Sequence, residues 1–127
     1  MQMQVYANDT MTSVASAAEL DAVFATAGGW GVQMLGPGDR RLALIFDGPQ
    51  SNLVWEGDLD IRLSWGPVPP GMPPEQTVAD DAEDFPEWMS MANDYEPYIS
   101  EELARRAGHE FLATGERPTC VLWLMKP

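Results

Sequence analysis

The spacing of apolar residues changes period along this chain, and this change constrains the fold more than any other feature. Near the N-terminus, Leu20, Val23, Phe24 and Ala27 recur at the spacing of one helix face. Between residues 31 and 65, apolar side chains come instead in short runs separated by glycine, proline and aspartate, which is typical of strands joined by turns. The sequence therefore predicts a helix that packs on a sheet.

Two predicted helices have identifiable ends. The first is expected to begin after Ser16, because Glu19 follows at the spacing of a capping box, and to end at the glycine pair 28–29. The second is expected to begin after Ser100 and to end at Gly115. The apolar face of the second helix consists of Leu103, Ala107 and Phe111.

Strands are predicted before the first helix, between the helices and after the second helix. Four of them follow the first helix as an antiparallel meander, and the predicted strands cover residues 3–6, 31–35, 42–46, 53–55, 61–65 and 120–125. In the fourth meander strand, Ile61, Leu63 and Trp65 alternate with polar residues, so this side is expected to face the core. The last strand is apolar on both faces and is therefore expected at the centre of the sheet.

The predicted fold is a single α+β domain over residues 1–127. It has a mainly antiparallel sheet of about five to six strands and two helices, in the order β-α-β-β-β-β-loop-α-β. The loop, at about residues 66–99, is rich in proline and in acidic residues, and its prolines favour an extended path over helix or central strand. A loop of this length inside a compact domain is either functional or mobile.

The charge balance limits the partners that the chain can bind. It has 20 Asp and Glu against 7 Lys and Arg, a formal net charge of −13 and a pI near 4.1. Such a surface repels phosphate backbones and anionic lipids, so binding to nucleic acid or to a membrane is not expected. A basic protein would be attracted and captured faster, so a protein partner is expected.

The cellular location is predicted from the cysteine and from the N-terminus. Cys120, the only cysteine, lies in an apolar run, as expected for a buried thiol in a reducing compartment. Residues 1–6 have neither the basic nor the apolar region of a signal peptide, and no apolar window has the length of a membrane span. The sequence therefore predicts a cytoplasmic protein.

The residues that most enzymes use are scarce. His109 is the only histidine, and on a helix it would lie on the solvent side near Arg105 and Arg106. No cysteine–histidine cluster has zinc spacing, and no glycine-rich loop carries the lysine of a phosphate site. The sequence therefore predicts no enzyme, no metal and no cofactor.

One motif near the C-terminus is specific. The second predicted helix closes with a Phe-x-x-Thr-Gly-x-Arg-Pro element, and a strand with a tryptophan follows it. The residues of this motif are Phe111, Thr114, Gly115, Arg117, Pro118 and Trp123. The motif resembles the ending of immunity protein family 1, and the order of the preceding helix and hairpins agrees with that family.

The resemblance implies an immunity protein that is encoded beside a polymorphic toxin, often a nucleic-acid deaminase. Such a protein binds and inhibits its cognate secreted toxin by occluding the active site or the substrate groove, without chemistry of its own. Because the chain is strongly acidic, the expected partner is a basic toxin domain.

The predicted toxin-binding residues lie in the second half of the acidic loop. Their carboxylates would accept hydrogen bonds from Arg and Lys of the toxin, and their aromatic rings would form the desolvated centre of the contact. The predicted contact residues are Asp80, Asp81, Glu83, Asp84, Phe85, Glu87, Trp88, Asp94, Tyr95 and Tyr98. A second acidic edge, formed by Glu56, Asp58 and Asp60, is a weaker candidate.

Two other function classes stay open at this point. The chain would be another acidic inhibitor, such as a DNA mimic, if its carboxylates were spaced like phosphates across a surface. It would be a small carboxylate enzyme or a metabolite-binding domain if carboxylates such as Asp58 and Asp60 shared a strand face in a pocket.

Overall fold

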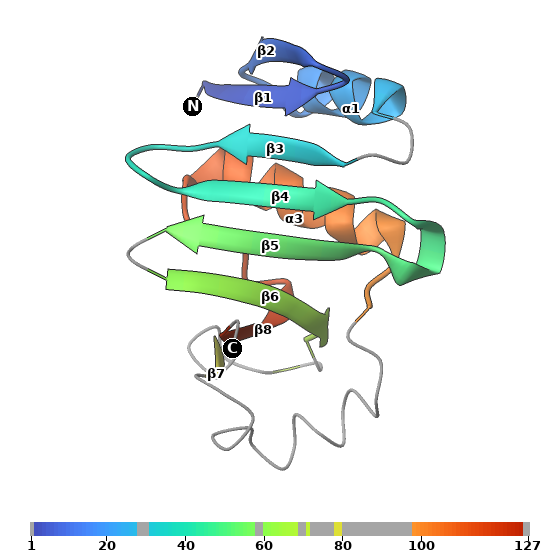
Figure 1. Cartoon of the computed structure of the whole chain (residues 1–127), viewed down its shortest axis with the longest axis vertical. Helices are drawn as coiled ribbons and strands as arrows, with labels where there is room; N and C mark the ends of the chain where they lie inside the picture. The colour runs from blue at the N-terminus through green and yellow to red at the C-terminus, as the bar shows by residue number, and fades with distance from the viewer. Residues whose placement is uncertain are drawn as a thin grey trace.

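The described part of the chain folds as a sheet with two helices, α1 and α3, on one face (Figure 1). The computed structural model describes residues 2–27, 31–57, 60–68, 71, 78–79 and 98–125. The eight strands of the sheet lie in the order β2-β1-β3-β4-β5-β6-β8-β7. All neighbouring strands are antiparallel except β7 and β8, which are parallel. The predicted α+β class with a mainly antiparallel sheet and two helices is confirmed.

The meander predicted in the middle of the chain is present as β3 to β6, and the sheet has two strands more than the sequence analysis proposed. The strands are β1 (Met3–Ala7), β2 (Thr10–Val14), β3 (Val32–Leu35), β4 (Arg41–Ile45), β5 (Asn52–Gly57), β6 (Asp60–Pro67), β7 (Val78–Ala79) and β8 (Val121–Met125). The additional strands are β2 and β7. A short 3-10 helix, η1 (Gly48–Gln50), connects β4 to β5.

β2 was not predicted because it is an edge strand with little apolar character. It pairs with β1 through a tight hairpin whose two turn residues, Asn8 and Asp9, have φ angles of 52° and 60°. A two-residue turn with both φ angles positive matches the twist of the strands that it joins. Within β2 only Val14 is buried, so no alternation of apolar and polar residues marks the strand in the sequence.

Helix α1 (Ala17–Thr26) begins as the capping box predicts. The hydroxyl of Ser16 accepts a hydrogen bond from the backbone N–H of Glu19 at 3.2 Å, and the Glu19 carboxylate accepts one from the N–H of Ala15 at 3.3 Å. The helix ends with Ala27 as its C-cap. The glycine pair 28–29, which was expected to end it, lies outside the described residues.

Helix α3 (Glu101–Thr114) also has the predicted ends. Ser100 caps it by accepting a hydrogen bond from the N–H of Leu103 at 3.1 Å. At the other end Gly115 has a φ of 70° in the left-handed region and donates its N–H to the carbonyl of Phe111 at 2.7 Å.

Alternation along each strand gives the sheet two different faces. The face covered by α1 and α3 forms the core, and its residues on the sheet include Val5, Met34, Leu42, Leu44, Leu53 and Trp55. Phe111 of α3 is fully buried against this face, as predicted, and its ring meets the Trp55 ring edge-on at a centroid distance of 5.4 Å. The opposite face is turned toward the viewer in Figure 1, and we call it the front face.

The strand β8 is paired on both edges but does not lie at the centre of the sheet. Val121, Leu122 and Trp123 are completely buried, as the apolar run predicts. However, β8 stands between β6 and β7, next to the end of the sheet. The prediction of a central position was wrong, because the short strand β7 is enough to pair the outer edge of β8.

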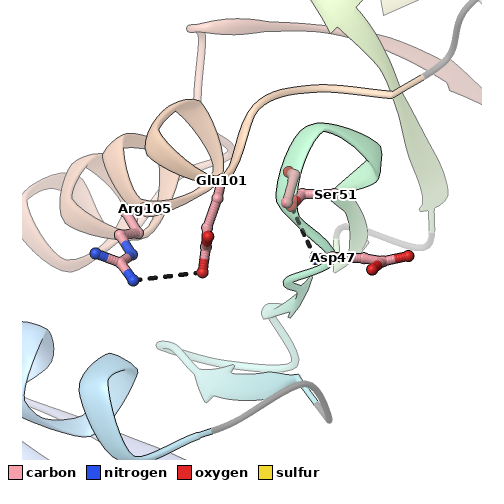
Figure 2. Close-up of polar contacts among 5 residues, drawn as sticks. Asp47, Ser51, Glu101 and Arg105 are labelled. Carbon is pink, nitrogen blue, oxygen red and sulfur yellow. Dashed lines mark hydrogen bonds and ion pairs between the residues drawn. The ribbon is translucent and has the colours of Figure 1, made fainter.

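The connection from β4 to β5 forms a hydrogen-bonded corner beside the start of α3 (Figure 2). The N–H of Asp47 donates to the hydroxyl of Ser51 at 3.0 Å, and that hydroxyl donates to the carbonyl of Gly48 at 2.8 Å. Ser51 also exchanges two backbone hydrogen bonds with Ile99, just before α3 begins. This pairing fixes the start of α3 beside the sheet.

Candidate functional site

Of the predicted toxin-binding residues, only Tyr98 lies in the described part of the chain. The other nine are Asp80, Asp81, Glu83, Asp84, Phe85, Glu87, Trp88, Asp94 and Tyr95, and they lie outside the described residues. Tyr98 is exposed, while its neighbour Ile99 is buried and paired with Ser51. The ring of Tyr98 lines a hollow of about 200 Å³ together with Leu63 and Trp65 of β6.

Glu56 and Asp60, two residues of the second acidic edge, do not form a carboxylate pair. In the register of β5 and β6, Glu56 lies opposite Ile61, and Gly57 lies opposite Asp60. The side chains of Glu56 and Asp60 therefore point to opposite faces of the sheet. The Asp60 carboxylate accepts a hydrogen bond from Nε of the buried Arg62 at 2.6 Å. Asp58 lies outside the described residues.

The buried side of β6 is the opposite of the one predicted. Ile61 is exposed, and Leu63 and Trp65 are only half-buried, whereas Arg62 and Ser64 point to the side that is buried. The prediction was wrong because both polar side chains find partners on that side. Arg62 is neutralised by Asp60, and the Ser64 hydroxyl accepts the N–H of Leu53 at 2.8 Å.

The front face carries apolar side chains from six strands, β1 to β6. Pairing across the strands places Tyr6 beside Met11 and Gln33, places Ala43 beside Gln33, and places Ile61 beside Glu56. The front-face residues include Gln4, Tyr6, Met11, Ser13, Gln33, Leu35, Arg41, Ala43, Ile45, Asn52, Val54, Glu56, Ile61 and Leu63. This surface was not predicted from the sequence, although the alternation of residues along β1, β4 and β6 was a signal for it.

His109 lies at the contact between the two helices rather than on a purely solvent-facing side. Its Nε2 is 2.7 Å from Oδ1 of Asp21 on α1, and its ring stacks on Phe24 at a centroid distance of 6.2 Å. The side chain is about one third exposed. The expected position near the arginines of α3 was incomplete, because helical spacing alone does not reveal which flank α1 covers.

The remaining ionisable groups include one largely buried thiol. Burial, with a smaller contribution from the nearby Glu110 carboxylate, raises the pKa of the Cys120 thiol to about 11. Among the residues that the structure describes, no group of three His, Cys, Asp or Glu side chains is placed to hold a metal ion. In the same residues, no helix combines the length and the apolar character that crossing a bilayer requires.

The C-terminal motif stabilises the junction between α3 and β8. Gly115 ends the helix, and its carbonyl accepts a hydrogen bond from the Arg40 guanidinium at 2.8 Å. The Thr114 hydroxyl donates to the carbonyl of Glu110 at 3.0 Å and accepts the N–H of Glu116 at 3.1 Å. These contacts direct the chain from the helix into the strand.

The same motif continues into the buried strand. The indole N–H of Trp123 donates to the carbonyl of Pro118 at 2.7 Å, which satisfies its only polar group in the core. These motif residues therefore stabilise the fold at the junction of α3 and β8.

Comparison with known proteins agrees with this motif. The family model described as "Immunity protein Imm1" matches residues 8–125, which is nearly the whole chain. Neither a curated protein nor a solved structure matches the chain. The resemblance to immunity protein family 1 is confirmed, and the chain belongs to the Imm1 family of immunity proteins.

Proposed function

We propose that this chain binds a cognate basic toxin domain, a nucleic-acid deaminase, and inhibits it by occluding the active site or the substrate groove. The observation that carries the proposal is the family match over residues 8–125. In this proposal the immunity protein acts in the cytoplasm and performs no chemistry of its own. The inhibition is then purely a matter of binding.

The charge of the chain supports a basic partner. A toxin that acts on nucleic acid needs a positively charged groove to hold the phosphate backbone. The net charge of −13 attracts such a groove over a long range and disfavours binding of the chain itself to nucleic acid. Substrate and immunity protein would thus compete for one basic surface.

The arrangement of Glu56 and Asp60 argues against a catalytic pair formed by these two carboxylates. Their side chains leave opposite faces of the sheet, and the Asp60 carboxylate is engaged by Arg62. Acid–base catalysis requires two groups within reach of one substrate. These two carboxylates do not meet that requirement.

The acidic segment remains the proposed first contact with the toxin. It comprises Asp80, Asp81, Glu83 and Asp84, with Phe85, Glu87, Trp88, Asp94, Tyr95 and Tyr98 behind them in the sequence. Carboxylates suit the Arg and Lys of a nucleic-acid groove, and the aromatic residues suit a desolvated centre. Tyr98, the described member of this set, is exposed beside β6.

Co-expression in a bacterial host tests the function. The toxin domain encoded by the adjacent gene is induced with this chain, with an unrelated acidic protein of similar charge, or alone. We expect growth and an unmodified nucleic-acid pool only with this chain. Equal damage in all three cultures would contradict an immunity function.

A further inference from the structure

The large apolar side chains that are exposed in the described part of the chain all lie on or beside one surface. They are Met11 (49% exposed), Ile61 (45%), Tyr98 (41%), Ile45 (40%) and Tyr6 (39%). Strand pairing places Tyr6, Met11, Ile45 and Ile61 on the front face, and Tyr98 lines a hollow with Leu63 and Trp65 beside it.

The other side of the molecule has a different surface. Where α1 and α3 are exposed they present small or charged residues, such as Ala25, Glu102 and Ala113. A solvated surface normally carries single apolar residues scattered over all sides. Concentration of the large ones on one sheet face is typical of a surface that a partner covers.

The front face also has a hollow beside the β1–β2 hairpin. It has a volume of about 560 Å³ and is lined by Tyr6, Asp9, Gln33, Ala43 and Ile45, among others. The Tyr6 hydroxyl donates to the Asp9 carboxylate at 3.0 Å, which holds the carboxylate in a hollow lined by both polar and apolar residues. A hollow that combines apolar side chains with a fixed carboxylate suits the long apolar stem and charged end of an Arg or Lys side chain.

We propose that the front face is the surface on which the toxin domain docks, with Ile45 and Ile61 as apolar contacts on either side of Val54 and with Asp9 and Glu56 receiving basic side chains of the toxin. This inference rests on the proposed function and adds a location to it. The acidic segment leads directly into Tyr98 in the sequence, so capture by the segment and docking on the front face use adjoining parts of the chain.

Charge decides between a basic partner and a second copy of this chain. Two copies would each bring a net charge of −13, and their repulsion opposes pairing of the front faces at low salt. A basic protein gains attraction from the same charge while covering the same apolar side chains. The occupant of the front face is therefore a basic protein.

The test measures binding of the whole chain to the purified toxin domain encoded by the adjacent gene. The double variant Ile45→Arg/Ile61→Arg adds charge and bulk at two positions of the front face, on either side of Val54. The matched control, Ala25→Arg/Ala113→Arg, adds the same charge on exposed helix positions away from that face. We expect the front-face pair to weaken binding at least about 100-fold, chiefly by faster dissociation, and the control pair to change it less than about threefold.

Two further double variants keep the test independent of folding. Ile45→Thr/Ile61→Thr retains β-branched side chains and should weaken binding about 10-fold without loss of the thermal unfolding transition. Ile45→Glu/Ile61→Glu should weaken binding less than the arginine pair, because the toxin surface is basic. If the glutamate pair bound the toxin domain more weakly than the arginine pair, the inference of a basic partner would be overturned.

Each remaining outcome has a distinct meaning. If the parent chain binds and the folded front-face variants bind as tightly, the docking surface is wrong while the proposed function stands. If the parent chain itself does not bind the toxin domain, the proposed function fails and this inference fails with it. If sedimentation shows a dimer of the parent that the arginine pair dissociates, the occupant is a second copy and the inference is overturned.

Discussion

The imidazole Nε2 of His109 lies 2.7 Å from the carboxylate of Asp21, and this contact joins α3 to α1. The two residues are 88 positions apart in the sequence. His109 also stacks on Phe24, so its ring contributes packing as well as a polar contact. The only histidine of the chain is therefore part of the helix–helix interface.

Replacing His109 with Ala should lower the free energy of unfolding modestly, by about 1 kcal/mol, because both partners are partly exposed. Chemical denaturation measures the change. A double-mutant cycle with Asp21→Ala should give a coupling of about 0.5–1 kcal/mol. Inhibition of the toxin should be unchanged, since the pair lies on the helix side of the sheet. Loss of inhibition in the folded variant would place His109 in the toxin contact.

Phe111 and Gly36 are expected to be energetically coupled. A Cβ built on Gly36 would lie 2.4 Å from Cζ of Phe111, so Gly36→Ala should cost about 1–3 kcal/mol by overpacking. Phe111→Ala should cost about 3–5 kcal/mol, because the ring is fully buried. Combining Gly36→Ala with Phe111→Leu should cost less than the sum of the two single changes. Strict additivity in denaturation experiments would contradict the close approach.

Cys120 should react slowly with thiol reagents. Desolvation raises its pKa to about 11, so little of the reactive thiolate is present at neutral pH, and the reaction rate should climb as the pH rises toward that value. Alkylation by iodoacetamide at pH 7.5 should be many times slower in the native protein than in the urea-unfolded chain. Equal rates in the two states would show that the thiol is not desolvated.

Much of the fold follows from local signals in the sequence. Ser16 with Glu19, and Ser100 with Gly115, define helix ends by hydrogen bonds within a few residues, and such bonds need no tertiary context. β2 and β7 were not predicted, because a two-residue strand or an exposed edge strand carries no apolar period. Their positions follow from pairing with β1 and β8, which a local pattern does not contain.

The candidate site was harder to predict because it depends on which strand face is covered. The alternation of Ile61 with polar neighbours is the pattern of a core-facing residue when the strand is considered alone. In the structure, however, the buried side of β6 holds Arg62 and Ser64. Their partners, Asp60 and the N–H of Leu53, make this possible. The approach of α1 to α3 beside Gly108, where a Cβ would lie 2.8 Å from Phe24, likewise determines the contacts of His109 only in three dimensions.

The acidic segment should control the rate of capture. Changing Asp80, Asp81, Glu83 and Asp84 to their amides should slow association most at low salt. Salt screens the attraction between charges beyond about 8–10 Å at physiological ionic strength, and lower salt extends that range. Stopped-flow association with the toxin domain at several salt concentrations measures this. Truncating Trp88 to Ala should instead speed dissociation with little change in salt dependence.

The control for that experiment removes the same number of charges elsewhere. The amide variants of Asp39, Asp47, Glu102 and Glu116 change four exposed acids outside the segment. If net charge alone governed capture, both sets would slow association equally. A larger effect of the segment is expected, and an amide segment that associates as fast as the parent at every salt concentration would rule it out as the capture surface.

The central claim is that this chain inhibits a toxin by binding it, and titration of purified proteins tests it most directly. The proposed deaminase activity of the toxin domain on nucleic acid is measured while this chain is added stepwise. The toxin domain is kept at a concentration far above the dissociation constant of the complex. We expect activity to fall linearly and to vanish near a stoichiometric ratio, and excess nucleic-acid substrate to slow the onset of inhibition. Undiminished activity in the presence of excess folded chain would contradict the account.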